Sequence, residues 1–139
     1  MSYETQNNYV QKNPKPVTEC YFESKRKGEN QVTGRKGEDK AELYLKSEGF
    51  EIIQRNYRTR QGEIDIIATK GEFLVFVEVK TRSTLAFGDP LEAIDRRKVQ
   101  KYRKMAEEYI IRRRLFDKDV RFDAVGIVGD SINYVPDAF

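Results

Sequence analysis

The sequence contains no histidine, and Cys20 is its single cysteine among 139 residues. The lack of histidine excludes zinc sites built on imidazole, histidine general bases and Ser-His-Asp triads. One cysteine cannot form an internal disulfide, which is compatible with a reducing cytosol. Any hydrolytic chemistry must therefore depend on carboxylates, lysine and hard metal ions.

Long apolar runs are also absent, because the longest comprises five residues, at 73–77. Such a run is far too short to cross a membrane. The first ten residues, MSYETQNNYV, contain neither a basic region nor an apolar stretch, so no signal peptide is expected. These absences predict a cytoplasmic protein without a membrane partner.

Charge, by contrast, is abundant: 35% of the residues are charged and 38% are hydrophobic, with eight Tyr and eight Phe. This composition is polar but still typical of a globular protein, and the length predicts one domain with one moderate core. The net charge of +3 permits a nucleic-acid partner without implying one.

The chain divides into a tail and a domain. Residues 1–33 are rich in Asn, Gln, Lys, Glu and Pro, which predicts a flexible N-terminal tail, with 17–22 able to dock locally. Within the domain, 34–139, the breaker at 87–90 separates elements that the apolar spacing predicts as follows: helices over 35–47 and 91–114, and strands over 50–58, 63–69, 73–80, 120–128 and 132–135. The order αβββαββ indicates an α/β fold with a central mixed sheet flanked by helices.

Four charged residues interrupt two of these strands. Glu63 and Asp65 share one face of the first strand, and Glu78 and Lys80 share one face of the next, because side chains alternate along a strand. Carboxylates so close together repel each other, which makes physical sense around a divalent cation. Hard oxygen ligands suit Mg²⁺ or Mn²⁺, and a neighbouring lysine can orient a water molecule.

The register of the hairpin decides whether the acids meet. A turn centred on residues 70–71 pairs residues whose numbers sum to 141, so that Asp65 faces Phe76 and Glu63 faces Glu78. This register places the apolar residues together on the opposite face: Ile64, Ile66, Val75, Val77 and Val79. The alternative is that Glu78 and its neighbours are ordinary edge-strand charges, but the joint pattern favours a metal site.

The stretch GEIDIIA…FVEVKTR resembles the catalytic core of the PD-(D/E)XK nuclease superfamily, which has the restriction-endonuclease-like fold. The fuller string GRKGEDKAELYL…EGF…N…GEIDIIA…FVEVKTR…FG…RFDAV…DAF, over 34–139, is similar to the YraN-like family of small bacterial proteins. Archaeal Holliday-junction resolvases are more weakly similar, mainly over 36–82. The strict Pro-Asp dipeptide is absent, since Ile64 precedes Asp65, a departure that the superfamily tolerates.

The resemblance implies an αβββαβ core and a set of site residues. Asp65, Glu78 and the backbone carbonyl of Val79 would hold the metal, and Lys80 would be the catalytic lysine. Glu38, on the first helix, matches the glutamate that usually completes such sites.

Two further acids have less certain roles. Glu42 lies one helical turn after Glu38 and is the alternative to it. Glu63 is either a base that supports the metal ligands or a solvated first residue of its strand, and the former is slightly favoured.

Basic residues supply candidate contacts to phosphate. Residues 91–114 contain nine basic and four acidic side chains, and an ordinary solvated helix face explains them equally well. Five residues near the predicted site are expected to bind nucleic acid: Arg35, Lys36, Arg82, Arg97 and Lys101. The first two would lie where free N–H groups at a helix start already favour phosphate. No helix-turn-helix, zinc finger or RNA-binding motif is visible, so base-specific recognition is not indicated.

These observations lead to one main hypothesis and two alternatives. The main hypothesis is a Mg²⁺-dependent endonuclease that hydrolyses DNA phosphodiesters, with branched DNA as a candidate substrate. The alternatives are a non-catalytic nucleic-acid-binding module and a scaffold of a DNA-processing complex. A homodimer is compatible with double-strand cleavage, although nothing in the sequence specifies an interface.

Overall fold

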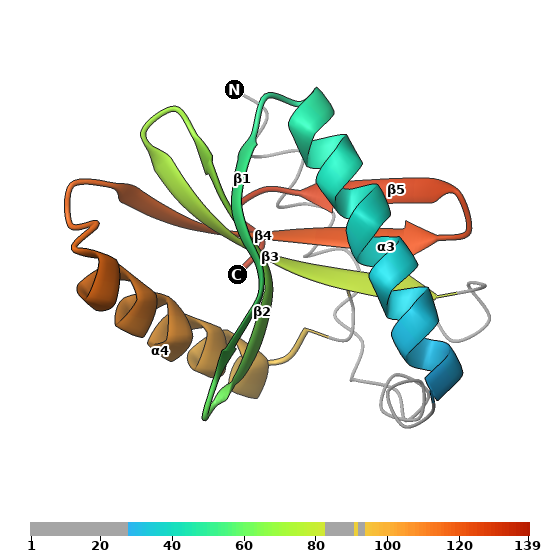
Figure 1. Ribbon diagram of the computed structural model, residues 1–139, viewed down its shortest axis with the longest axis horizontal. Helices are drawn as coiled ribbons and strands as arrows, with labels where there is room; N and C mark the ends of the chain where they lie inside the picture. The colour runs from blue at the N-terminus through green and yellow to red at the C-terminus, as the bar shows by residue number, and fades with distance from the viewer. Residues whose placement is uncertain (1–27, 83–90, 92–93) are drawn as a thin grey trace.

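The computed structural model describes residues 28–82, 91 and 94–139 (Figure 1). The predicted tail up to residue 27, with Cys20, and the breaker at 87–90 lie outside the described residues. The described elements follow the predicted order αβββαββ. They are α3 (Gly28–Ser47), β1 (Glu51–Thr59), β2 (Gly62–Lys70), β3 (Phe73–Arg82), α4 (Arg96–Arg113), β4 (Asp119–Val128) and β5 (Ser131–Val135).

The five strands form one mixed sheet in the order β1-β2-β3-β4-β5. Neighbouring strands are antiparallel except β3 and β4, which are parallel and are joined by the connection that contains α4. The predicted αβββαβ core is therefore confirmed. Among the described residues, no helix is long and apolar enough to cross a membrane.

The sheet has a helix on each face, which explains why β3 is apolar without alternation. Val75 and Val77 belong to the cluster that includes Ala41 and Leu45 of α3. Leu74 and Phe76 of β3 point to the other face and pack against α4. Their cluster is made of Ile64, Ile67, Leu74, Phe76, Tyr102, Met105, Ala106, Tyr109 and Phe122. Burial on both faces fixes β3 at the centre of the molecule.

Helix α3 begins at Gly28, seven residues before the predicted start at residue 35. Its inner side carries Ala41 and Leu45, which are buried, and Tyr44, which packs against the same cluster. Gly49 follows the helix with φ of 90°, a left-handed conformation that favours glycine and ends the helix.

Helix α4 is shorter than predicted and begins at Arg96 rather than at residue 91. Asp95 caps it, because its carboxylate accepts the backbone N–H of Lys98 at 2.9 Å. Leu91 and Ile94 precede the helix and pack with Ala124 in a separate cluster. The apolar spacing therefore extends N-terminal to the helix, because Leu91 and Ile94 lie before the Asp95 cap.

The predicted hairpin register is wrong by two residues. The turn lies at residues 71–72, where Gly71 has φ of 58°, and Lys70 pairs with Phe73. Paired residues therefore sum to 143 instead of 141. A shift of two keeps each side chain on its predicted face, because the strand period is two. The start of β2 is the exception. Ile64 lies in the cluster under α4 and not with Val75. Glu63 and Glu78 do not share a face as predicted, because Glu63 approaches Glu38 of α3 and Glu78 contacts Lys98 of α4.

Strands β2 and β3 diverge beyond the pair Ile66–Val77, where their described pairing ends. The first part of β2 pairs with β1, for example Ile64 with Tyr57, while the last part of β3 pairs with β4. Figure 1 shows the two strands separating at the centre of the sheet. We call the space between the diverging ends, from Glu63 to Ile66 on β2 and from Val77 to Lys80 on β3, the fork.

Candidate functional site

Asp65 lies in the fork and is 5% exposed. Its Oδ2 accepts the backbone N–H of Val79 at 2.8 Å, so that a side chain bridges the diverging strands. The backbone N–H of Asp65 in turn donates to the hydroxyl of Tyr102 on α4 at 3.5 Å. These contacts fix Asp65 from both sides.

Two further carboxylates approach Asp65. Glu38 on α3 and Glu63 on β2 each place an oxygen so that the three ligand atoms lie within 4.8 Å of one another. We call Glu38, Glu63 and Asp65 the acidic triad. Glu63 and Asp65 share a strand face as predicted, while Glu38 is brought in by the packing of α3.

Gly37 is the reason that α3 can approach so closely. A Cβ atom at this position would lie 2.1 Å from Oγ1 of Thr81 and 3.2 Å from its Cβ. The helix backbone therefore rests directly on β3, one residue before Glu38 and next to Lys80. In this Gly-Glu pair, Gly37 allows close contact between α3 and β3, and Glu38 places its carboxylate next to Asp65.

The triad is surrounded by donors that offset its charge. Burial raises the pKa of Glu38, and the hydrogen bond from Arg55 opposes this shift. Arg55 Nη2 lies 3.3 Å from Glu38 Oε2, and Arg58 Nε lies 2.7 Å from Glu63 Oε2. The side-chain amide of Asn56 faces Glu38 and Glu63, and it can donate to both when its nitrogen rather than its oxygen is turned toward them.

Glu78 occupies the β3 side of the fork and is 1% exposed. Its Oε1 contacts two lysine nitrogens, Lys80 Nζ at 3.1 Å and Lys98 Nζ of α4 at 3.0 Å. Burial, followed by the charge of Lys98, lowers the pKa of Lys80 to about 4. Burial would lower the pKa of Lys98 as well, but the charge of Glu78, the hydrogen bonds with Lys80 and Glu78 and the charge of Asp65 together raise that pKa. These opposite directions favour the positive charge on Lys98 and the neutral amine on Lys80.

Tyr102 joins the two sides of the fork from α4. Burial raises its pKa well above the ordinary value, and the charges of Glu78 and Asp65 add to this effect. The phenol therefore stays protonated beside the two carboxylates. The neutral phenol of Tyr102 therefore adds no positive charge that would offset the carboxylates of Glu78 and Asp65.

The structure thus brings together Glu38, Glu63 and Asp65, with Glu78 and Lys80 across the fork. The predicted alternative Glu42 is not part of the triad. It pairs with Lys46 at 3.0 Å and lies 3.6 Å from Arg55, the arginine that also contacts Glu38.

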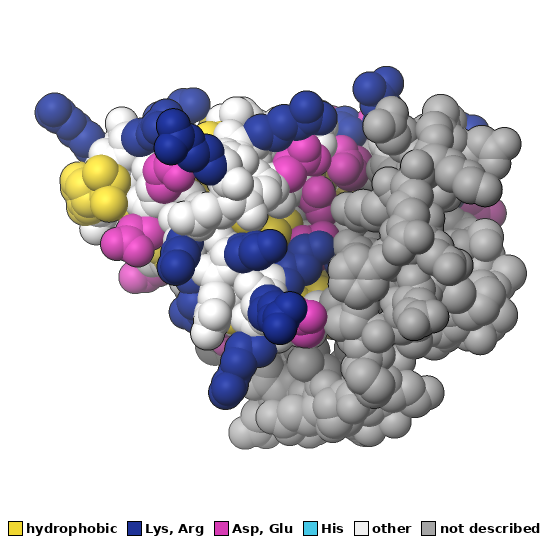
Figure 2. Space-filling view, turned by 90° about the horizontal axis from the view of Figure 1, so that it is seen from below, with side chains coloured by type: hydrophobic (Ala, Val, Ile, Leu, Met, Phe, Trp, Pro, Cys, Tyr) yellow, Lys and Arg dark blue, Asp and Glu magenta, His cyan; other side chains and the backbone are white. Residues whose placement is uncertain are grey.

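The predicted phosphate contacts lie in different settings. Arg35 and Lys36 are exposed, but the early start of α3 places them in the third turn, away from the free N–H groups of a helix start, so that part of the argument is wrong. Arg97 and Lys101 are exposed on α4, and the half-buried Arg82 ends β3. Figure 2 shows Lys and Arg side chains spread over the face seen from below, with a group of acidic side chains among them.

Sequence reasoning missed three contributors to the site. Lys98 interrupts the apolar side of α4 four residues before Tyr102, and a lysine at that spacing was the available signal. Tyr102 was placed on that apolar side without a polar role. Asn56 lies within a strand, where asparagine is disfavoured, which was a second signal.

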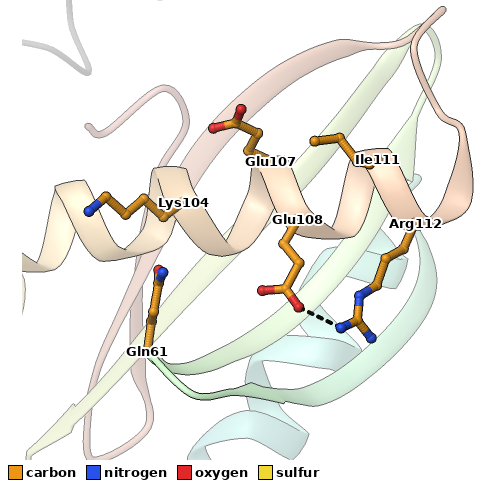
Figure 3. Close-up of a pocket in the computed structure, with 6 residues that line it drawn as sticks. All are labelled: Gln61, Lys104, Glu107, Glu108, Ile111 and Arg112. Carbon is orange, nitrogen blue, oxygen red and sulfur yellow. Dashed lines mark ion pairs between the residues drawn. The ribbon is translucent and has the colours of Figure 1, made fainter.

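A shallow depression lies along α4 and holds none of the acids of the fork. It is lined by Gln61, Lys104, Glu107, Glu108, Ile111 and Arg112 (Figure 3). Glu108 pairs with Arg112 at 3.0 Å across its floor. This is the pattern of a solvated helix face rather than of a ligand site.

The fold and the fork define an α/β protein with a candidate metal centre built from carboxylates of separate elements. Residues 37–127 match the model of a family described as "Uncharacterised protein family UPF0102", and the chain belongs to that family. A UPF0102 protein of Persephonella marina is 44% identical over 108 residues, which cover 78% of this chain and 93% of the relative. A UPF0102 protein of Dictyoglomus turgidum is 44% identical over 116 residues, which cover 79% of this chain and 98% of that relative. A UPF0102 protein of Rhodococcus opacus is 44% identical over 115 residues, again with 79% and 98% covered.

Proposed function

We propose that this protein is a Mg²⁺-dependent endonuclease that hydrolyses DNA phosphodiesters. The observation that carries the proposal is the fork itself, where the acidic triad converges opposite the buried pair Glu78 and Lys80. Converging carboxylates cost free energy through repulsion and are useful when a cation binds between them. A buried neutral lysine next to them suits the handling of a water molecule.

The donor set fits a small hard cation. All candidate ligands are oxygens, which Mg²⁺ and Mn²⁺ prefer, and opposite ligands of Mg²⁺ lie about 4.2 Å apart. The triad oxygens lie within 4.8 Å of one another, whereas neighbouring ligands of an octahedral Mg²⁺ lie about 3.0 Å apart, so the side chains would have to move closer together when an ion binds. When bound, the ion would neutralise phosphate charge and acidify a coordinated water molecule.

We assign the ligands to Asp65, Glu78 and the backbone carbonyl of Val79, with Glu38 and Glu63 grouped around Asp65. The support for Asp65 is its burial and its fixed orientation on Val79 N–H. Glu78 is shared by two lysines, so its service as a ligand requires one of these contacts to loosen.

The remaining residues would handle water and charge. Lys80, as a neutral amine, would accept a hydrogen bond from the attacking water, orient it toward phosphorus and take up the proton that this water loses. A bond from the water oxygen to phosphorus forms, the phosphorus–oxygen ester bond breaks, and the leaving oxygen takes a proton from a solvent water molecule. Lys98 offsets the negative charge that grows on the phosphate oxygens.

DNA would be bound mainly through its backbone. Arg97 and Lys101 project from the helix that carries Lys98, and Arg82 follows the lysine strand. Backbone recognition releases counterions, so affinity should fall steeply with salt and show little dependence on base sequence. Recognition by shape would suit branched DNA, and we place the protein in the cytoplasm.

The test is a cleavage screen over linear, flapped, four-way and single-stranded DNA with Mg²⁺ or Mn²⁺. Asp65→Asn and Lys80→Ala should each reduce the cleavage rate by a factor on the order of 10² or more. Glu72→Gln is the matched control, because it removes an exposed acid from the same hairpin and should cut at the original rate. Cleavage that survives exhaustive chelation, or that persists in Lys80→Ala, would contradict the mechanism.

The second candidate is a nucleic-acid-binding module without turnover. The observation that favours it is the double contact of Lys80 and Lys98 with Glu78, which closes one side of the fork with local ion pairs. A binder would show salt-dependent DNA affinity without cleavage of any substrate in the screen. Sedimentation with and without DNA would test the predicted homodimer in the same samples.

A further inference from the structure

We infer that Asn56 is a positioning residue, which holds Glu38 and Glu63 in the arrangement that a divalent cation requires. The inference rests on the proposed metal-dependent function of the fork. Neither the predicted site nor the family description assigns a role to this residue.

The contacts of Asn56 bridge two elements. With the amide turned so that its nitrogen rather than its oxygen faces the acids, this nitrogen lies 3.0 Å from Glu38 Oε2 on α3 and 3.0 Å from Glu63 Oε1 on β2. An amide nitrogen carries two hydrogens, so one can be donated to each carboxylate. The opposite orientation would place the amide oxygen against two anions, which is unfavourable. One side chain of β1 therefore joins the two acids that flank Asp65.

The backbone of Asn56 is unusual for a strand. Its φ is 54°, in the left-handed region, which asparagine tolerates better than most residues. It lies between the pairs Arg55–Ile66 and Tyr57–Ile64, opposite Asp65. The facing strand is irregular at the same point, because Ile64 and Ile67 lie on the same side of the sheet. Such local strain persists where the surrounding structure requires a particular side-chain direction.

Charge neutralisation does not explain the residue. Arg55 and Arg58 already bring cations to Glu38 and Glu63, at 3.3 and 2.7 Å. The amide of Asn56 adds no charge, and it differs from both arginines in contacting the two carboxylates at once. What it contributes is direction, since it fixes one oxygen of each acid and thereby orients the other. Residues that orient metal ligands in this way typically change metal affinity 10–100-fold when they are removed.

The test is a Mn²⁺ titration of the full chain without DNA, followed by the electron paramagnetic resonance signal of free Mn²⁺. Asn56→Gly keeps the left-handed backbone and removes the amide. We expect it to bind Mn²⁺ about tenfold or more weakly than the original chain. Arg114→Gly is the matched control, because Arg114 has φ of 55° at the exposed end of α4, and it should bind Mn²⁺ like the original chain.

Thermal melts without metal separate positioning from a structural role. The positioning role predicts the same melting temperature for Asn56→Gly and Arg114→Gly. Unchanged Mn²⁺ affinity in Asn56→Gly would overturn the inference, and so would a variant that unfolds while Arg114→Gly stays folded. If the original chain itself binds no Mn²⁺, the proposed metal site fails, and this result is distinct from failure of the role of Asn56.

Discussion

Asp123 and Asp65 are carboxylates buried on the same sheet, but their surroundings differ in kind. Asp123 on β4 is fully buried, and both of its oxygens contact Arg121 at 2.9 Å. The hydroxyl of Tyr134 donates to it as well, and the backbone N–H of Asp137 donates at 2.9 Å. A buried charge that is paired and fully hydrogen-bonded is the arrangement expected of a structural carboxylate.

Around Asp65 other acids approach. Oxygens of Glu38 and Glu63 lie within 4.8 Å of an Asp65 oxygen, and Val79 N–H donates to Oδ2 of Asp65. Burial alone therefore does not distinguish a structural carboxylate from a candidate metal ligand. Donors to both oxygens surround Asp123, whereas Asp65 lies among like charges, an arrangement that a bound cation would stabilise further.

The largest effect is expected at the structural carboxylate. Asp123→Asn removes the buried negative charge that contacts the guanidinium of Arg121, which should lower the free energy of unfolding by about 3–5 kcal/mol. Urea denaturation measures this change. The variant keeps the acidic triad, so Mg²⁺ should raise its melting temperature by as much as that of the original chain. A loss below about 1 kcal/mol would break the comparison.

Gly37→Ala should have an intermediate effect, because it moves the site without altering its charge. The new methyl group would meet Thr81 at 2.1 Å from Oγ1, so α3 must shift away from β3, at a cost of about 1–3 kcal/mol. The shift also withdraws Glu38, so Mg²⁺ should raise the melting temperature less than in the original chain. Adding Thr81→Ala should recover part of both losses, and no recovery would contradict the packing explanation.

Tyr134→Phe should cost about 1 kcal/mol at pH 7, because Asp123 loses one donor. The variant should also respond less to alkali. Burial and the charge of Asp123 raise the pKa of Tyr134 above its ordinary value of 10.0. Above pH 10 the unfolded chain releases this proton while the folded chain keeps it, so stability falls as pH rises. Denaturation at pH 7, 9 and 11 should give a shallower decline for Tyr134→Phe, and equal slopes would contradict this account.

The smallest change, and one of opposite sign, is expected for Asp65→Asn without metal. The amide oxygen can still accept Val79 N–H, while one of the crowded negative charges is removed. The variant should therefore be as stable as the original chain or more stable, by on the order of 1 kcal/mol. Mg²⁺ should raise the melting temperature of the original chain and much less that of the variant. A clear loss of stability in the metal-free variant would place Asp65 with Asp123 as a structural carboxylate.

The face of most strand residues could be predicted from sequence because it depends on a period of two. The hydrophobic alternation correctly placed Ile66, Val75 and Val77 together, even though the turn lay one position later than predicted. It failed in the irregular part of β2, because Glu63 approaches Glu38 of α3 whereas Glu78 contacts Lys98 of α4. The register could not be fixed, because a shift by two residues leaves the same pattern on each face. The fork could not be predicted from sequence either, because the two strands diverge where the start of β2 pairs with β1 and the end of β3 pairs with β4.

The helix contributions were predictable only in part. The Gly-Glu pair indicated Glu38, but the residue that α4 delivers depends on where the helix begins. Asp95 sets that start and thereby turns Lys98 toward Glu78. The role of Asn56 could not be predicted without the backbone coordinates, because no periodic pattern in the sequence indicates a left-handed residue inside a strand.

The parallel pairing of β3 with β4 affects the order in which the chain folds. β1, β2 and β3 follow one another through short turns, so their hairpins are local and close within microseconds. The β3–β4 contact must wait for the long connection that carries α4, and such non-local pairing is slow. Asp65 and Glu78 therefore meet on the hairpin before Lys98 and Tyr102 can reach them, and in that interval dissolved cations are the partners at hand to screen their repulsion.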